Sequence, residues 1–235
     1  MHLNNNYIGN ELELFKNATN WKKYFSKEIA DFIYGDVLEV GAGIGINTSY
    51  LLNNNKINSI TCIEPDEVLC EQINENHKKT NITTVEIING TIQKTNKTFD
   101  TIIYIDVLEH IEHSIDEIEL IKKRLNPNGH LIILVPAFNF LYSEFDKRIG
   151  HFRRYNKNKL REEINQTLKE KKIFYLDSLG FFASLANKLI LKKNTPSEKN
   201  IHFWDKKLIP LTKLFDKLIC FTFGKSLIGI YQKTN

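Results

Sequence analysis

The chain has 235 residues, of which 42% are hydrophobic, a composition that suits one α/β domain with a sizeable core and excludes wholesale disorder. Its net charge of +4 is unevenly distributed. Residues 1–149 carry 14 Lys and Arg against 21 Asp and Glu, and residues 150–235 carry 18 against 7. The basic C-terminal third indicates an acidic substrate or an anionic surface as partner, with a solvated lysine face as the alternative.

The cysteines, the N-terminal residues and the length of the apolar runs indicate the cellular compartment. Cys62, Cys70 and Cys220 form no CxxC pair, so neither a zinc site nor a disulfide framework is predicted. The first residues are polar and acidic where a signal peptide would be basic and then apolar. No run reaches the roughly 18 apolar residues that span a membrane. We therefore expect a cytoplasmic protein.

Helical and strand patterns alternate along the chain, with short connections. The strands are apolar and β-branched, as buried parallel strands are. This alternation predicts a parallel sheet with helices on both faces, whose ligands bind at the carboxyl ends of the strands. Helices are expected over 11–34, 45–53, 66–78, 115–125 and 157–169, and strands over 36–40, 59–64, 83–88, 100–105, 130–135, 172–176 and 227–231.

A glycine-rich loop follows the first predicted strand. It contains Gly41, Gly43 and Gly45, with Glu39 two residues before the first glycine. Glycines allow a sharp turn and a close approach of the backbone to a ligand. The pattern is G-x-G-x-G, and Ile46 stands where NAD binding requires a third glycine or an alanine. The loop therefore disfavours NAD.

An acidic residue, Glu64, ends the second predicted strand 23 residues after Gly41. A carboxylate at this point of a nucleotide-binding sheet can accept both hydroxyls of a ribose. The alternative is a surface glutamate at a strand end. Together with the glycine loop, Glu64 predicts a cofactor that contains a nucleoside.

Four segments carry a resemblance to a known family: VLEVGAGIG, CIEPD, FDTIIYIDVLEHI and LNPNGHLIILVP. In order and spacing, over about residues 30–136, they resemble the class I S-adenosylmethionine-dependent methyltransferases. The resemblance implies a three-layer, Rossmann-like α/β fold with seven strands, mostly parallel, and an antiparallel last strand. It implies S-adenosylmethionine as the cofactor and S-adenosylhomocysteine as the product.

The resemblance also implies roles for individual residues around this cofactor. Trp21 is the least specific of them, since its alternative role is core packing, and Asn89 and Thr91 stand where many members have an aspartate. The implied contacts are Gly41, Gly43 and Gly45 with the methionine and ribose, Glu39 with the amino group, Glu64 with the ribose hydroxyls, Pro65, Gly90, Thr91 and Ile92 with the adenine, Asp106 with the methionine moiety, and Trp21 as a cover.

The segment after the fourth strand limits the possible methyl acceptors. It begins with Asp106 where methyltransferases of DNA bases have an Asp/Asn-Pro-Pro-aromatic run, so no nucleic-acid target is expected. His110 is a candidate catalytic residue, as a base or as support for the cofactor loop, and its alternative is a structural role. Asp106, Glu109, His110 and His113 have mixed spacing, so no metal site is predicted.

A polar box follows the fifth strand and is expected to lie over the active-site mouth. It resembles the Asp-x-x-x-Gly-His-x-Arg-Arg-Tyr box of a bacterial and archaeal methyltransferase subgroup, often associated with surface polysaccharide or lipid pathways. His151 is the candidate base for a hydroxyl acceptor. The candidate substrate-binding residues are Tyr142, Asp146, Arg153, Arg154 and Tyr155. Alternatively, an arginine pairs with Asp146 or Glu144 and fixes the loop.

The C-terminal part mixes apolar and basic residues, over 181–191 and 203–223. Such a stretch suits peripheral contact with an anionic membrane, such as the inner membrane surface, a lid over the pocket, or helices packed on the core. We expect one methyltransferase domain over 1–235. Its parts are N-terminal helices over 1–34, a cofactor-binding core over 35–136, a substrate-side insertion over 137–224 and a last strand over 225–235.

The sequence therefore predicts methyl transfer from S-adenosylmethionine to a small polar or glycan/lipid-precursor acceptor, itself anionic. O-methylation in surface polysaccharide or lipid biosynthesis is the first hypothesis. N-methylation of a polar amine, a non-catalytic cofactor-binding partner protein and an adaptor on acidic lipids are the alternatives.

Overall fold

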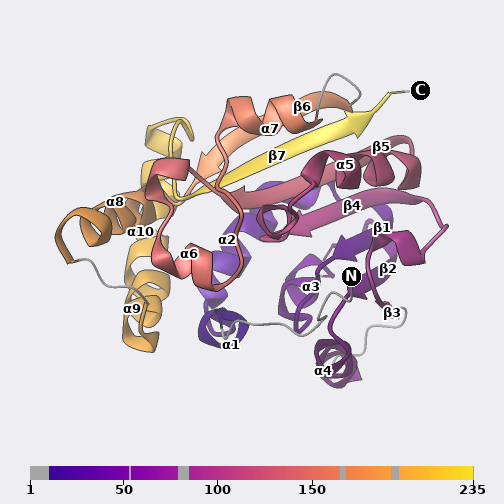
Figure 1. Ribbon diagram of the computed structural model, residues 1–235, viewed down its shortest axis with the longest axis horizontal. Helices are drawn as coiled ribbons and strands as arrows, with labels where there is room; N and C mark the ends of the chain where they lie inside the picture. The colour runs from indigo at the N-terminus through magenta and orange to yellow at the C-terminus, as the bar shows by residue number, and fades with distance from the viewer. Residues whose placement is uncertain (1–10, 53, 79–84, 165–167, 192–195, 235) are drawn as a thin grey trace.

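The computed structural model describes residues 11–52, 54–78, 85–164, 168–191 and 196–234. Within them, seven strands form one twisted sheet in the order β3-β2-β1-β4-β5-β7-β6 (Figure 1). β7 runs antiparallel to both of its neighbours, and the other adjacent pairs are parallel. The predicted Rossmann-like fold is confirmed. The strands are β1 Gly35–Val40, β2 Ile57–Glu64, β3 Val85–Asn89, β4 Phe99–Ile105, β5 Leu125–Pro136, β6 Leu168–Leu176 and β7 Ser226–Lys233.

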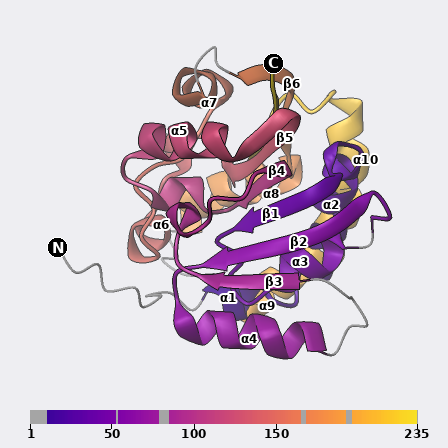
Figure 2. The same ribbon diagram turned by 90° about the vertical axis from the view of Figure 1, so that its right-hand side faces the viewer.

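Helices cover both faces of the sheet (Figure 2). One apolar cluster joins the sheet to α2, α3, α4 and the C-terminal helices, and the other joins it to α5 and α7. The helices are α1 Glu11–Phe15, α2 Thr19–Ile29, α3 Ile46–Leu51, α4 Glu67–Lys78, α5 Ser114–Arg124, α6 Glu144–Arg148, α7 Lys157–Ile164, α8 Ser178–Ala186, α9 Glu198–Phe203 and α10 Ile209–Leu218. Single turns occur at Ala30–Phe32, Ile92–Lys94, Leu108–His110, Asn139–Leu141, Asn187–Leu191 and Trp204–Leu208.

The central strands are buried on both faces, which explains their continuous apolar sequences. Val37 and Leu38 are both fully buried, yet they belong to opposite apolar clusters because side chains alternate along a strand. Burial of each such side chain contributes about 1.5–3 kcal/mol. This core holds the carboxyl ends of β1, β2 and β4 at one edge.

The largest errors in the predicted boundaries concern α7, β6 and β5. The helix expected over 157–169 ends at Ile164, residues 165–167 lie outside the described part, and Leu168 already begins β6. β6 is an edge strand, and its exposed Lys169, Glu170 and Lys171 hide the strand pattern. β5 begins at Leu125, five residues early, because the Asn-Pro-Asn-Gly segment forms an irregularity within the pairing with β4. Of the strand predicted over 83–88, residues 83 and 84 lie outside the described part.

The C-terminal helices α8, α9 and α10 gather beyond the carboxyl end of β5 (Figure 1). Asp216 holds this group to α2, because it accepts hydrogen bonds from Tyr24 Oη (2.9 Å) and from the backbone N–H groups of Asp177 (2.9 Å) and Ser178 (3.0 Å). Asp216 is fully buried. Buried charged acceptors of this kind fix the position of the insertion, because an unpaired carboxylate there would be costly.

Two further buried carboxylates complete this attachment. Asp177 caps α8 by accepting from Gly180 N–H (2.9 Å), and it also accepts from Trp204 Nε1 (2.8 Å). Asp205 accepts from the backbone N–H of Trp21 (2.9 Å). Among the described residues, no helix is both long and apolar enough to cross a bilayer.

Candidate active site

The glycine loop turns sharply at the carboxyl end of β1. Gly41 and Gly43 both have positive φ, +66° and +58°. A Cβ on Gly41 would lie 2.5 Å from Val107 Cγ2, so a larger residue does not fit there. Gly41 N–H donates to the carbonyl of Ile63 (2.8 Å), which holds the loop against the end of β2. A Cβ on Gly43 would meet Leu12 of α1 at 3.2 Å, so α1 lies over the loop.

Glu64 lies at the carboxyl end of β2, directly beside the glycine loop. Its carboxylate is 7% exposed and accepts backbone hydrogen bonds from Gly43 (2.9 Å) and Asp66 (3.1 Å). Burial raises the pKa of Glu64, and these two N–H donors oppose the rise. Each oxygen retains a lone pair for a further donor. A fixed, buried acceptor of this kind fits the two hydroxyls of a ribose.

Glu39, the acidic residue before the loop, is buried with 2% exposure. Its Oε2 accepts from Thr48 Oγ1 at 2.5 Å. Burial raises the pKa of Glu39 to about 7, and the Thr48 hydroxyl acts in the opposite direction. A buried carboxyl group under the loop, held by one hydroxyl, is suited to receive a positively charged amino group above it.

The predicted adenine contacts lie together at the ends of β2 and β3. Asn89 Nδ2 donates to the carbonyl of Pro65 (3.0 Å), and Gly90 N–H donates to the carbonyl of Glu64 (2.9 Å). Thr91 is exposed, whereas Ile92 is fully buried and supports the segment from beneath. These bonds join the two strand ends into one rim.

Asp106 follows β4 with a positive φ of 53° and an exposed side chain. Desolvation by the surrounding protein raises the pKa of Asp106 to about 6, while the charges of His151, Lys225, Lys22 and Arg154 act to lower it. Asp106 is therefore a carboxyl group at the end of β4 on which several basic groups act electrostatically.

Trp21, the predicted cover of the cofactor, is 8% exposed. Its ring packs edge-on against Phe25 at 5.6 Å and lies 5.8 Å from Trp204. This packing favours the core role over the cofactor contact.

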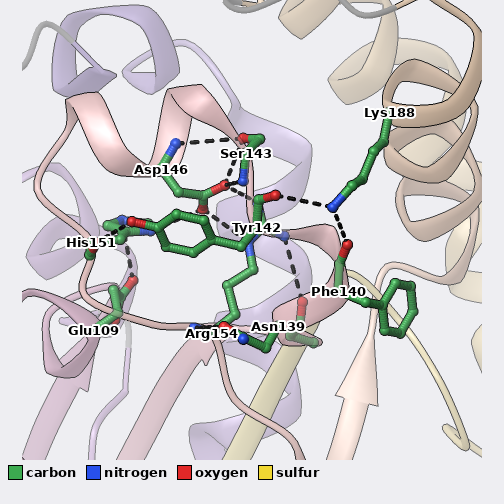
Figure 3. A network of polar contacts seen from close by, with 10 residues as sticks. Glu109, Asn139, Phe140, Tyr142, Ser143, Asp146, His151, Arg154 and Lys188 are labelled. Atoms are coloured by element: carbon green, nitrogen blue, oxygen red, sulfur yellow. Dashed lines mark hydrogen bonds and ion pairs between the residues drawn. The ribbon is translucent and has the colours of Figure 1, made fainter.

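The polar box is organised by one carboxylate, Asp146 (Figure 3). It accepts from Arg154 through Nε and Nη2 (both 2.8 Å), from Ser143 N–H (2.8 Å) and Oγ (2.6 Å), and it bonds His151 Nδ1 (3.0 Å). Burial acts to raise the pKa of Asp146, but the bonds from His151 and Arg154 hold it well below its usual range. Asp146 therefore remains ionised and fixes the His151 ring.

His151 turns its other nitrogen toward Glu109 (Figure 3), and His110 lies beside both residues. Its Nε2 lies 3.8 Å from Glu109 Oε1, and the His110 and His151 rings meet edge-on with centroids 4.5 Å apart. Burial, and then the charge of His151, lowers the pKa of His110 to about 4. Burial raises the pKa of Glu109, whose side chain is fully enclosed. The two predicted catalytic histidines are thus neighbours.

The remaining box residues have partners within the protein. Arg153 Nη1 donates to the carbonyl of Ile111 (2.9 Å) and to Ser114 Oγ (2.9 Å). Tyr155 is fully buried, and Tyr142 Oη donates to the carbonyl of His151 (2.6 Å). Together with the bidentate Arg154–Asp146 pair, these bonds favour the alternative that the arginines fix the loop. A direct contact of these side chains with substrate stays a prediction.

Two lysines in the site were not among the predicted residues. Lys22, on α2, is 6% exposed and its pKa is lowered by burial to about 8. Lys225 precedes β7, and burial also lowers its pKa. Because β7 is antiparallel, Lys225 at its beginning lies at the same edge as the carboxyl ends of the parallel strands. The family resemblance implied an antiparallel last strand and therefore this placement. No comparable sequence signal marks Lys22.

A model of a methyltransferase domain family matches residues 13–179, more than half of the chain. A search of curated proteins gives no significant match. Three solved structures share the fold over nearly the whole chain. The first is the N-methyltransferase NodS from Bradyrhizobium japonicum WM9 in complex with S-adenosyl-L-homocysteine, 14% identical, covering 93% of this chain and 89% of that one, with a TM-score of 0.61.

The second is a putative methyltransferase of Haloferax volcanii in complex with the Trm112 methyltransferase activator, 12% identical, covering 96% of this chain and 94% of that one, with a TM-score of 0.67. The third is the [4+2]-cyclase SpnF, 15% identical, covering 97% and 95%, with a TM-score of 0.63. At such identities the likeness concerns the fold, and the cyclase illustrates that a fold does not fix a reaction.

The match to the family model identifies the family, which likeness of fold alone does not do. The geometry of the site is consistent with this family. The glycine loop, Glu39 and Glu64 form a cradle for an amino acid and a ribose at one edge of the sheet. The chain belongs to the methyltransferase domain family, and it is a methyltransferase whose cofactor is S-adenosylmethionine.

Proposed function

We propose that this enzyme methylates a hydroxyl group on a small polar acceptor, a glycan or lipid precursor that carries an anionic group. The observation that carries the proposal is His151, held by Asp146 at 3.0 Å on the side of the site where Asp106 ends the fourth strand. A hydroxyl is a poor nucleophile until it loses its proton, whereas a neutral amine needs no base. A fixed imidazole therefore favours O-methylation over N-methylation.

The chemistry divides between cofactor and protein. S-adenosylmethionine supplies the electrophilic methyl group, and the protein aligns the acceptor. Because the ionised Asp146 can only accept, His151 Nδ1 carries a proton, and in the neutral form of the ring Nε2 presents a lone pair to the site. That lone pair can take the hydroxyl proton, which is worth about 10²–10⁴-fold in rate.

The anionic part of the proposal rests on cationic groups around Asp106. Lys225 extends over the Trp204 ring, with Nζ 4.9 Å from its centroid. Lys22 Nζ donates to the carbonyl of Phe15 (2.6 Å), which leaves two further donors. An acceptor that carries phosphate or carboxylate could bind these ammonium groups.

A lipid-linked acceptor is supported by the outer surface of the C-terminal helices. Large apolar side chains there are exposed by about half or more: Phe182, Leu189, Phe203, Leu211, Leu214, Phe215 and Leu218. Lysines at 188, 199, 206, 207, 213 and 217 lie on the same elements. Apolar side chains beside lysines suit the interface of an anionic bilayer, such as the inner membrane surface.

The test is an acceptor panel. Purified enzyme and S-adenosylmethionine would be incubated with sugars, sugar phosphates, polyprenyl-phosphate-linked sugars and polar amines, and methylated products identified by mass spectrometry. We expect product from an anionic hydroxyl acceptor. Methylation of amines alone would overturn O-methylation. Cofactor binding without turnover on any acceptor would favour a non-catalytic binding protein.

A further inference from the structure

Three side chains with metal-binding atoms converge beside the proposed base. The ligand atoms of Glu109, His110 and His151 all lie within 4.8 Å of one another. Glu109 and His110 belong to the turn after β4, and His151 comes from the polar box about forty residues later. The fold therefore assembles one carboxylate and two imidazoles from two separate segments.

Glu109 provides an independent observation. Its side chain is fully buried, and within the described part of the chain neither carboxyl oxygen has a hydrogen-bond partner. Its Oε1 lies 3.8 Å from His151 Nε2, the ring nitrogen that does not bond Asp146. A fully buried carboxyl group without a hydrogen-bond partner, set beside a ring nitrogen, is a feature that a bound cation would satisfy.

The outer partners of both histidines fit metal ligands. A histidine that binds a metal usually donates its other N–H to a carboxylate or a backbone carbonyl, which sets the tautomer and orients the ring. His151 Nδ1 bonds Asp146 at 3.0 Å, and Asp146 is fixed in turn by the bidentate Arg154. The His110 ring bonds the backbone of Gly150. Both rings are thus held with one nitrogen left for the cluster.

We propose that Glu109, His110 and His151 bind one divalent transition-metal cation. Two imidazoles with one carboxylate favour ions such as Mn²⁺, Co²⁺ or Zn²⁺ over Ca²⁺. Three protein ligands leave coordination positions open, as in catalytic sites.

This inference rests on the proposed O-methylation of a hydroxyl acceptor and changes one step of it, because the bound cation replaces His151 as the group that activates the hydroxyl. A hydroxyl that coordinates a divalent cation loses its proton more readily. His151 then serves as a ligand, and the hydroxyl proton passes to solvent. The methyl group moves from sulfur to the acceptor oxygen, and S-adenosylhomocysteine leaves as the neutral thioether. The cation thus takes over the activation otherwise assigned to the imidazole.

The experiment uses the full chain, stripped of metal with a chelator, without cofactor or acceptor. Co²⁺ is titrated by visible absorption and Mn²⁺ by calorimetry. We expect one bound ion per chain and a ligand-field spectrum typical of nitrogen and oxygen donors. Glu109→Gln keeps the shape of the side chain and should weaken binding by at least about tenfold. Glu117→Gln is the matched control, since Glu117 bonds Tyr104 outside the cluster and should leave binding unchanged.

Wild-type protein that binds neither ion, or Glu109→Gln that binds both as wild type does, would overturn the cation site. Circular dichroism of the variants verifies folding. Because the titrations contain no acceptor, their failure is distinct from failure of the proposed function. If the enzyme binds no metal but methylates a hydroxyl in a reaction that requires His151, the proposed function stands and the cation site is refuted.

Discussion

The two halves of the active site are built by different means. On the cofactor side, at the carboxyl ends of β1 and β2, backbone groups define the geometry, through the positive φ of Gly41 and the Gly43 N–H bond to Glu64. On the proposed acceptor side, between Glu109 and Tyr155, side chains define the geometry, through the hydrogen bonds that Asp146 accepts. Substitutions should therefore act differently on the two sides.

The comparison predicts that substitutions can change cofactor binding and acceptor binding independently. The cofactor cradle depends on short local segments that the sheet core holds in place. The acceptor side depends on bonds between distant segments, so its shape can vary without altering the cradle. It follows that a change in the polar box should reduce turnover while leaving cofactor affinity intact.

The largest effect is expected from His151→Ala. Turnover on the true acceptor should fall by about 10²–10⁴-fold, because the hydroxyl loses its activating group. Cofactor affinity by calorimetry should stay unchanged. The exposed His113 provides the control variant His113→Ala, which should retain activity. Near-normal turnover of His151→Ala would remove the imidazole from the reaction.

Arg154→Ala should cost about 3–5 kcal/mol of unfolding free energy, because it leaves the buried Asp146 without its bidentate partner. Denaturant unfolding measures this. Arg161→Ala is the control, since Arg161 forms a similar pair with Glu170 at the surface and should cost about 1 kcal/mol or less. Equal losses for the two variants would contradict the central place of Asp146.

Glu64→Ala should weaken S-adenosylmethionine binding by about 1–3 kcal/mol through loss of a charge-assisted hydrogen bond. Calorimetric titration provides the affinity. The exposed Glu67, the first residue of the following helix, serves as the control through Glu67→Ala. An affinity equal to that of the wild type would rule out the ribose assignment.

Glu39 gives the stability of the cofactor-free protein a pH dependence. Burial raises the pKa of Glu39 to about 7 from 4.5, so between these values the folded state keeps a proton that the unfolded state has lost. Stability should fall as pH rises through this window. Glu39→Gln should abolish this part of the fall and stabilise the protein by about 1–3 kcal/mol at pH 8. Denaturant titrations between pH 5 and pH 8 give the free energy of unfolding of both proteins. The same pH dependence for the wild type and for Glu39→Gln would refute this prediction.

The smallest effect on catalysis is expected at the exposed apolar surface. Leu214→Glu with Leu218→Glu should reduce binding to vesicles rich in anionic lipid, while turnover on a water-soluble acceptor stays unchanged. Val68 and Ile115 are similarly exposed on other elements, so Val68→Glu with Ile115→Glu is the matched control. Equal flotation of both double variants with vesicles would exclude this surface as the contact.

The cofactor side was predictable from the sequence because its signals are local. The glycine spacing, Glu64 at a strand end and Asp66 as the cap of α4 each depend on a few adjacent residues, and the cap is confirmed by hydrogen bonds from Val68 and Leu69 to Asp66 Oδ1. The antiparallel last strand was implied by the family resemblance and is also confirmed.

For the proposed acceptor side, the sequence predicted which residues take part but not how their side chains are arranged. The sequence marks the box as polar but does not say which side chains face inward, because that depends on contacts such as Arg153 with the carbonyl of Ile111. The convergence of Glu109 with His151 depends on two loops that are forty residues apart, and His113, considered beside them, is exposed instead. Contacts between residues so far apart in the chain produce no spacing pattern in the sequence.

The most direct test of the central claim is a calorimetric titration of the cofactor-stripped protein with S-adenosylmethionine, S-adenosylhomocysteine and NAD, repeated with Glu64→Ala. The account predicts saturable binding of both sulfur compounds at one site per chain, weaker binding to the variant and no binding of NAD. Binding of NAD, or of none of the three, would contradict the assignment of the glycine loop.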